Sequence, residues 1–392
     1  PMGTRADMFD FDQINDRRTS DSYKWNRYAE DMLPMWVADM DFMSPPEVLK
    51  ALEARVEHGI FGYGDPDAAL TELIVQRLQQ RYGWRVEPEH ILYQPGVGSA
   101  LNTVCKAVGE PGDGVLVQTP VYPPFLSAVE YQDRRLMVNP LKAVLDEREL
   151  HYEIDLDNFA DLIDDQPRLF LLCNPQNPSG RVFSENELRC MADLCVAKGV
   201  VMCSDEIHCE LLLGDKPHQP LAALSPEIAD QTITFMAPSK TFNLAGLRLS
   251  FAVVQNADLR KRLQLAARGL VASPDILAYP AAKAAYRSGG PWLQALLVYL
   301  RANRNHVTEF LRTALPELRS TSPEATFLTW IDCREADIAG DPYRFFLEQA
   351  RLVLNDGQSF GPGGEGFVRL NFGCPRQTLD EALTRMYAAL RP

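Results

Sequence analysis

The residue best suited to chemistry in this sequence is Lys240, in the segment 237–243. It follows the apolar residues 232–236, which have the length of a buried strand. A lysine in such a place is partly desolvated, and desolvation lowers the pKa of its ammonium group until the amine can act as nucleophile and base. A single lysine is more often a solvated surface charge, so the neighbouring motifs decide the interpretation.

Asp205 follows another apolar segment, where a carboxylate without a partner would be costly to bury. A protonated pyridine nitrogen is one partner that would stabilise the carboxylate, and such a pair would keep the ring electron-withdrawing. A helix N-cap or a structural salt bridge is the commoner role of a single aspartate. Glu206 should point the opposite way from Asp205, and we assign it no role.

The sequence Gly96-Val97-Gly98-Ser99 precedes a helical pattern at 100–105. Free N–H groups at a helix N-terminus could hold a phosphate there. A dinucleotide signature is excluded because its third glycine would fall at Leu101. By itself this glycine turn is weak evidence for a phosphate site, and it supports one only together with the motifs around Lys240 and Asp205.

The elements that must position these residues are short apolar runs that lack the alternation of half-exposed strands. They lie at 114–118, 169–173, 200–203, 232–236 and 249–254. Between them, Ser184 and Glu187 form a capping-box pattern and Gly199 stands where a helix would end. Alternating strands and helices predict an α/β fold with a mainly parallel sheet.

Polar residues follow four of the predicted strands, in the segments 119–122, 174–178, 204–208 and 237–240. Such sheets bind ligands beyond the carboxyl ends of their strands, so we expect one site at this edge. The length predicts two domains: a large one over 46–287, and a smaller α+β domain formed by 1–45 and 288–392.

Composition argues against several kinds of partner and site. The net charge of −14 argues against nucleic acid, and no apolar run is long enough to cross a membrane. Eight cysteines without a CxxC pair indicate reduced thiols and neither disulfides nor a metal site. With no secretion signal recognised, we expect a cytoplasmic protein. The histidines at 58, 90, 151, 218 and 306 match no metal spacing and are interpreted as structural.

Seven motifs in order resemble the fold-type-I enzymes that use pyridoxal 5'-phosphate (PLP), the aminotransferase class I and II superfamily, over nearly the whole chain. Within it the sequence is closest to the MalY/PatB-type cystathionine β-lyases, which are C–S lyases. The motifs are Leu33 to Phe42, Phe61 to Tyr63, Thr119 to Phe125, Asn174 to Arg181, Ser204 to His208, Ala237 to Gly246 and Arg369 to Arg376.

The resemblance implies a role for each matching residue. Lys240 is the catalytic lysine that forms a Schiff base with the cofactor, and Asp205 is the partner of the ring nitrogen. The other implied cofactor-binding residues are Tyr122, which stacks on the ring; Asn177 and His208, at its phenolic oxygen; and Val97, Gly98, Ser239, Arg248 and Tyr63, at the phosphate. A tyrosine usually stands at the place of His208 in related aminotransferases.

Substrate binding is implied for Arg369, Asn177 and Tyr63. Arg369 resembles the arginine that holds the substrate's α-carboxylate, a bidentate task for which lysine is poorly suited. Tyr63 resembles the tyrosine that reaches the neighbouring subunit, which implies a homodimer with composite active sites.

The function implied is α,β-elimination from L-cystathionine or related cysteine S-conjugates, giving a thiol, pyruvate and ammonia. An aminotransferase shares all of these residues and is the first alternative. A PLP-binding regulatory protein with incidental lyase activity is the second. The residues quoted do not identify the preferred sulfur amino acid.

Overall fold

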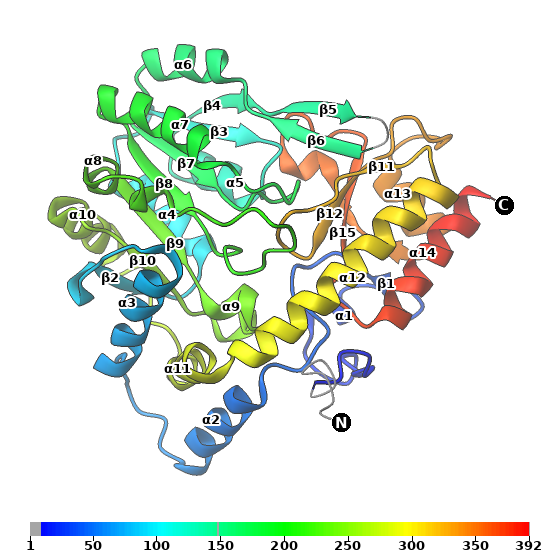
Figure 1. Cartoon of the computed structure of the whole chain (residues 1–392), viewed down its shortest axis with the longest axis horizontal. Helices are drawn as coiled ribbons and strands as arrows, with labels where there is room; N and C mark the ends of the chain where they lie inside the picture. The colour runs from blue at the N-terminus through cyan, green and yellow to red at the C-terminus, as the bar shows by residue number, and fades with distance from the viewer. Residues whose placement is uncertain (1–8, 147–148, 392) are drawn as a thin grey trace.

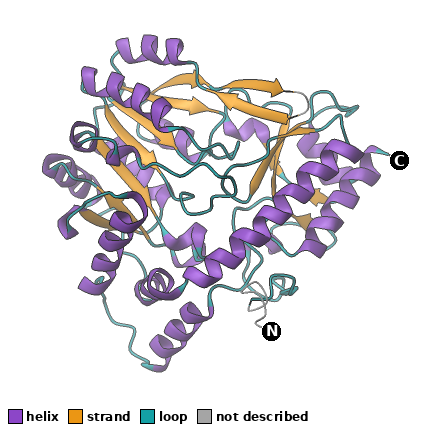
Figure 2. Ribbon diagram, in the orientation of Figure 1, coloured by secondary structure: helices purple, strands orange, loops and turns teal. Residues whose placement is uncertain are grey.

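The computed structural model describes residues 9–146 and 149–391, and its centre is a seven-stranded sheet (Figures 1 and 2). The strand order is β2-β10-β9-β8-β7-β3-β4. The strands are β2 (Ile91–Gln94), β3 (Gly114–Thr119), β4 (Arg135–Pro140), β7 (Leu169–Cys173), β8 (Val201–Asp205), β9 (Thr232–Met236) and β10 (Ser250–Val253). β10 runs antiparallel to both neighbours and the other pairs are parallel. The predicted α/β fold with a mainly parallel sheet is confirmed.

All five predicted strands are present, with ends within two residues of the prediction. They are buried because helices cover both faces of the sheet. Alternate residues of β3 enter different cores: Val115 and Val117 pack with α4 (Val97–Ala107), α5 (Pro124–Tyr131) and α10 (Ala257–Ala267). Leu116 packs on the other face, with α6 (Leu156–Asp164), α7 (Glu185–Lys198) and α8 (Pro226–Asp230).

The capping box predicted for α7 is confirmed. Ser184 Oγ accepts the N–H of Glu187 at 3.3 Å, and a Glu187 carboxylate oxygen accepts the N–H of Ser184 at 2.9 Å. Gly199 ends the helix in the left-handed conformation, with φ 69°. The helix therefore begins and ends where its sequence predicts.

The C-terminal region forms a second sheet, of order β11-β12-β15-β14. Its strands are β11 (Arg319–Ser320), β12 (Leu328–Asp332), β14 (Asn355–Asp356) and β15 (Phe367–Asn371), and its helices are α12 (Gly290–Ala314), α13 (Pro342–Gln349) and α14 (Arg376–Leu390). β1 (Leu33–Pro34) pairs with β13 (Leu352–Val353), so the N-terminal segment docks on this region as expected. The division at 45/46 and 287/288 stays a prediction.

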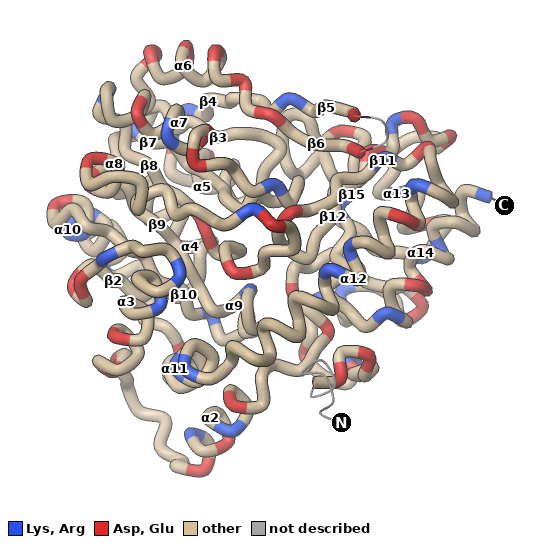
Figure 3. Tube along the Cα trace, in the orientation of Figure 1, with Lys and Arg blue, Asp and Glu red and all other residues tan. Residues whose placement is uncertain are grey.

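The remaining α-helices and strands of the described residues are α1 (Tyr23–Asn26), α2 (Pro46–Glu57), α3 (Ala68–Tyr82), α9 (Pro238–Thr241), α11 (Ala278–Ser288), and the hairpin of β5 (Lys142–Asp146) and β6 (Glu149–Glu153). Among the described helices, none has the length and apolar character that a membrane span needs. Acidic and basic residues are interspersed along the trace in the view of Figure 3.

Candidate functional site

A cavity of about 580 Å³ lies at the carboxyl ends of the parallel strands, where the sequence predicted a site. Its lining combines the ends of β7 and β8, the helix that follows β9, the start of α4, the N-terminal segment and β15. Ten of the eleven predicted site residues line it: Val97, Gly98, Tyr122, Asn177, Asp205, His208, Ser239, Lys240, Arg248 and Arg369. One cavity thus collects residues from most of the chain's length.

Lys240 lies in the short helix α9, directly after β9. Its Nζ donates a hydrogen bond to the carbonyl oxygen of Ala38 at 2.6 Å. Burial lowers its pKa to about 8; the positive charge of Arg369 acts in the same direction, and the carboxylates of Asp39 and Asp205 oppose it. A substantial share of the amine is therefore neutral near physiological pH and available as nucleophile and base.

Asp205, at the end of β8, is almost fully buried, and burial raises the pKa of its carboxyl group to about 7. Its Oδ1 accepts the N–H of Ile207 at 3.2 Å. Within the described residues no Lys, Arg or His nitrogen lies within 4.0 Å of its carboxylate. Asp205 therefore lines the cavity as a carboxyl group with no cationic partner among the residues that the structure describes.

Glu206 points away from Asp205, as predicted. Its carboxylate accepts the hydroxyl of Ser204 at 2.8 Å and the N–H of Leu221 at 3.0 Å, and it lies 2.7 Å from His218 Nε2. Its hydrogen-bond partners are structural, so Asp205 and Glu206 have separate surroundings although they are adjacent.

Three further residues, Tyr122, Asn177 and His208, line the same cavity as Asp205 and Lys240. His208 is buried, burial lowers its pKa well below the usual value, and its Nδ1 has no partner among the described residues. Asn177 accepts the N–H of Tyr122 through its backbone carbonyl at 3.1 Å. Burial also raises the pKa of the Tyr122 hydroxyl, so both ionisable rings are held neutral.

The glycine turn forms another wall. Gly96 has φ 128°, a conformation that favours glycine, and α4 begins at the next residue with its first N–H groups free of helix partners. Arg248 is exposed at φ 50°, just before β10, and Ser239 lies beside Lys240. N–H groups, a hydroxyl and a guanidinium around one space suit an anion such as phosphate.

Arg369 is buried on β15, and all of its hydrogen-bond acceptors are neutral. Its Nη1 donates to Asn177 Oδ1 at 2.8 Å, and its Nη2 donates to Trp36 O at 3.0 Å and to Asn355 Oδ1 at 2.6 Å. Burial lowers its pKa to about 10. No carboxylate of a described residue lies within 4.0 Å of it, so an anionic ligand would supply the missing counter-charge.

Tyr63 is the predicted residue that the structure does not bring into this cavity. Its side chain is fully exposed, and it lies in the segment between α2 and α3, which Figure 1 shows extending from the body of the chain. Residue-by-residue interpretation also omitted lining residues, in particular Ala38 and Asn355. Ala38 lies within the motif Leu33 to Phe42, which supported the family resemblance, whereas no sequence pattern marks Asn355 as a site residue.

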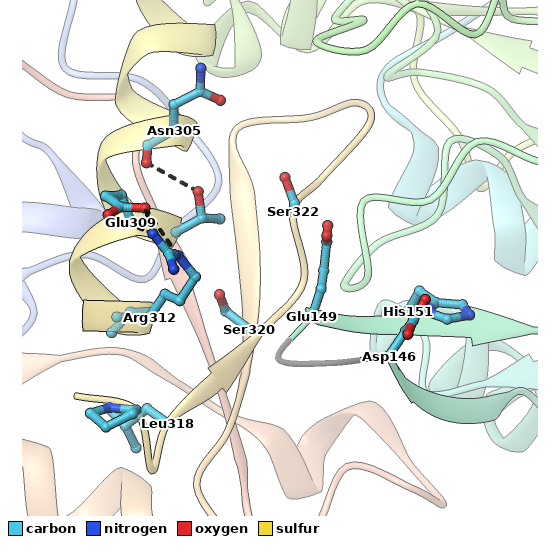
Figure 4. Close-up of a pocket in the computed structure, with 12 residues that line it drawn as sticks. Asp146, Glu149, His151, Asn305, Glu309, Arg312, Leu318, Ser320 and Ser322 are labelled. Carbon is cyan, nitrogen blue, oxygen red and sulfur yellow. Dashed lines mark hydrogen bonds and ion pairs between the residues drawn. The ribbon is translucent and has the colours of Figure 1, made fainter. Parts of the chain in front are cut away.

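A larger cavity, of about 760 Å³, lies between the β5–β6 hairpin and the end of α12 (Figure 4). Its carboxylates include Asp146, Glu149 and Glu309, and Glu309 is already paired with Arg312 at 2.6 Å. None of the predicted site residues lines it. Size alone does not make it the site of chemistry.

Comparison with known proteins places the chain in a family. The sequence matches the aminotransferase class I and II family over residues 30–386. It is 42% identical to cystathionine beta-lyase PatB of Bacillus subtilis, over 97% of this chain and 99% of that protein. It is 33% identical to protein MalY of Escherichia coli, over 98% and 99% of the two chains. The crystal structure of cystalysin from Treponema denticola, which contains PLP, is 31% identical and matches with a TM-score of 0.92 over 98% of this chain and 99% of that one. The resemblance is confirmed, and this chain belongs to the aminotransferase class I and II family.

Proposed function

We propose that this chain is a PLP-dependent C–S β-lyase that releases a thiol, pyruvate and ammonia from L-cystathionine or a related cysteine S-conjugate. The observation that carries the proposal is that Lys240 and Asp205 face one cavity, with the lysine pKa lowered and the aspartate pKa raised by burial. The relatives' names support it: PatB is named a cystathionine beta-lyase, and the cystalysin structure contains PLP.

The residues present fit PLP. Asp205 is a buried carboxylate that has no cation among the described residues, as the partner of a pyridinium nitrogen should have none. The Nδ1 of His208, which has no hydrogen-bond partner within the same residues, could meet a polar atom of the ring. Val97, Gly98, Ser239 and Arg248 would hold the phosphate, Tyr122 would stack on the ring and Asn177 would contact its phenolic oxygen. When bound, PLP supplies an aldehyde that condenses with amines and a ring that withdraws electrons.

In this scheme each residue has one task. Arg369 binds the α-carboxylate through its guanidinium fork. The neutral amine of Lys240 removes the α-proton, a step to which general-base catalysis typically contributes about 10²- to 10⁴-fold. The thiolate leaves from Cβ, and water converts the remaining enamine to pyruvate and ammonia.

Product analysis tests this function against the aminotransferase alternative. The purified protein with PLP is incubated with L-cystathionine, and separately with alanine and 2-oxoglutarate. We expect thiol, pyruvate and ammonia from the first mixture in equal amounts, and much slower glutamate formation in the second. Glutamate formation that outpaces thiol release would contradict the lyase assignment.

Arg369→Ala is expected to raise KM about 10- to 150-fold and to change kcat little. An arginine that only holds the carboxylate acts on the ground state and the transition state alike, and a charge-assisted hydrogen bond is worth about 1.5–3 kcal/mol. Steady-state kinetics on cystathionine measure both constants. Arg369→Lys, which keeps the charge and loses the fork, should give an intermediate KM. Unchanged KM in both variants would show that the carboxylate is bound elsewhere.

We further propose a homodimer in which Tyr63 contacts the phosphate in the neighbouring subunit. The support is its full exposure, next to the exposed apolar side chains of Ile60 and Phe61. Mixing Tyr63→Phe chains with inactive Lys240→Ala chains under exchange conditions tests this. The mixed dimer should have one site with both native residues, so affinity for PLP at that site should recover to the wild-type value. No recovery, or a monomer in sedimentation, would contradict the proposal.

The domain division at 46–287 is also proposed, supported by the pairing of β1 with β13, and limited proteolysis at the boundaries would test it. A cytoplasmic location is proposed because all eight cysteines are unpaired. Cell fractionation is its test.

A further inference from the structure

A group of four charged side chains lies in the N-terminal segment beside Lys240. Lys24 is almost completely buried, at 1% exposure, with its Nζ 2.8 Å from Asp41 Oδ2 and 3.7 Å from Asp39 Oδ1. Arg17 joins the same carboxylates, with Nη2 2.8 Å from Asp39 Oδ2 and Nη1 2.6 Å from Asp41 Oδ1. Lys24 and Asp41 are buried, and Arg17 and Asp39 are partly exposed. Burying charged groups is costly, and buried ion pairs are weak evidence for stability. Stability is therefore a poor explanation for this charged group, and its position beside Lys240 suggests a role in the site.

Two asparagines connect this segment to the elements that carry Lys240 and Arg369. Asn243, three residues after Lys240, donates from Nδ2 to the carbonyl oxygens of Met40 and Phe42, both at 2.8 Å. Asn371, two residues after Arg369, donates from Nδ2 to the carbonyls of Val37 and Asp39, both at 2.7 Å. The backbone is fixed on both sides of Ala38, whose carbonyl accepts the hydrogen bond from Lys240.

The charges that face Lys240 come from three elements. Arg369 on β15 opposes its ammonium form, and Asp205 on β8 and Asp39 in the N-terminal segment favour it. His208 is held neutral. If Asp205 pairs with the ring nitrogen of PLP, Asp39 remains as the carboxylate free to act on Lys240. No carboxylate of a described residue lies within 4.0 Å of Lys240 Nζ, so Asp39 acts through space.

We propose that Asp39 is a positioning residue for Lys240. Arg17 and Lys24 hold its carboxylate in place, and that carboxylate stabilises the ammonium form that Lys240 adopts while it carries the substrate's α-proton. The carbonyl of Ala38 accepts one hydrogen of this ammonium group and fixes its direction. The inference rests on the proposed role of Lys240, and it assigns a task to a partly buried carboxylate that the reaction otherwise does not use.

The two possible roles of Asp39, structural and electrostatic, predict opposite shifts of the Lys240 pKa when Asp39 is replaced. If its loss only loosened the segment, water would reach Lys240 and the pKa of the amine would rise toward its ordinary value. If its charge acts on Lys240, replacement by a neutral residue lowers that pKa further, because the ammonium form loses a stabilising anion. The direction of the shift therefore distinguishes the two roles.

The test measures the pH dependence of Lys240 acetylation in the full chain freed of PLP, with a trace of acetic anhydride and mass spectrometry of the Lys240 peptide. Only the neutral amine reacts, so the midpoint reports the pKa. Asp39→Asn is expected to lower the midpoint by roughly one unit. In the PLP-loaded enzyme, the acid limb of the kcat profile should move down by the same amount. Circular dichroism verifies the fold, and Asp39→Ser replaces Asp39→Asn if the latter does not fold.

Asp41→Asn is the matched control. It disturbs the same charged group but leaves Asp39 and both of its cationic partners in place, so it should not lower the midpoint. An unchanged or raised midpoint in the neutral Asp39 variant would overturn the proposal, as would an equal lowering in the control. If the PLP-loaded wild type released no thiol and pyruvate from L-cystathionine, the proposed function would fail instead, whatever the acetylation midpoints, so the two failures are distinguishable.

Discussion

Lys240→Ala is expected to reduce turnover of cysteine S-conjugates by at least about 10²- to 10⁴-fold, the usual contribution of a general base. The amine is partly neutral at physiological pH because burial lowers its pKa to about 8, and alanine supplies neither nucleophile nor base. PLP should still bind noncovalently, since the groups around its phosphate and ring remain. Thiol release under saturating substrate measures the loss.

The control for this variant is Lys240→Arg, which retains a positive charge but cannot act as a base at neutral pH. Both variants should be inactive, and small primary amines added to the solution should restore part of the activity of Lys240→Ala only. Borohydride treatment of the wild type with PLP should add the mass of a phosphopyridoxyl group, which is PLP less water plus two hydrogens, to the peptide containing Lys240, and should leave the corresponding peptide of both variants unlabelled. Wild-type rates in either variant would mean that another lysine is the catalyst.

The sheet and its catalytic edge could be predicted from the sequence because the signals are local. Five apolar runs of strand length lack the alternation of exposed strands, and each is a buried strand in the structure. β2 was not predicted because four residues give little pattern, and β4 because its exposed Arg135 and Leu136 dilute the apolar signal. In a parallel sheet, strand ends meet at one edge, so the sequence alone predicts that Asp205 and Lys240 lie close together.

The rest of the site depends on contacts between distant segments, which no local pattern encodes. The Lys240–Ala38 hydrogen bond joins residues 202 positions apart, and Asn355 enters the site only because β14 pairs with β15. Lys24 is the opposite case, since a lysine is expected at the surface and this one is buried against Asp41. Its burial follows from tertiary packing alone.

Asp205→Asn is expected to lower the activity of the PLP-loaded enzyme and to raise the stability of the chain without PLP. In the PLP-loaded enzyme, kcat should fall about 10- to 150-fold, because the variant loses a charge-assisted bond of about 1.5–3 kcal/mol that stabilises the negative charge developing at Cα. KM should change little, since Arg369 still binds the carboxylate. The chain without PLP should instead become more stable above neutral pH, because it no longer buries an unpaired carboxylate.

The sign of the stability effect follows from the raised pKa of Asp205, about 7 in the folded chain against an ordinary 3.8. Between these values the folded chain binds more protons than the unfolded chain, so the contribution of Asp205 to stability is full below about pH 4 and is lost as the pH rises to about 7. The loss amounts to roughly 4 kcal/mol at most. The free energy of unfolding is measured with denaturant for the cofactor-free wild type and Asp205→Asn. The variant should exceed the wild type by more at pH 8 than at pH 5.

Glu206→Gln is the control, because the Glu206 carboxylate already has hydrogen-bond partners. This variant should lower the free energy of unfolding and leave kcat nearly unchanged. If the difference in free energy of unfolding between Asp205→Asn and the wild type did not change with pH, Asp205 would already have a partner in the cofactor-free chain. Its carboxylate would then not be available to pair with a pyridinium nitrogen.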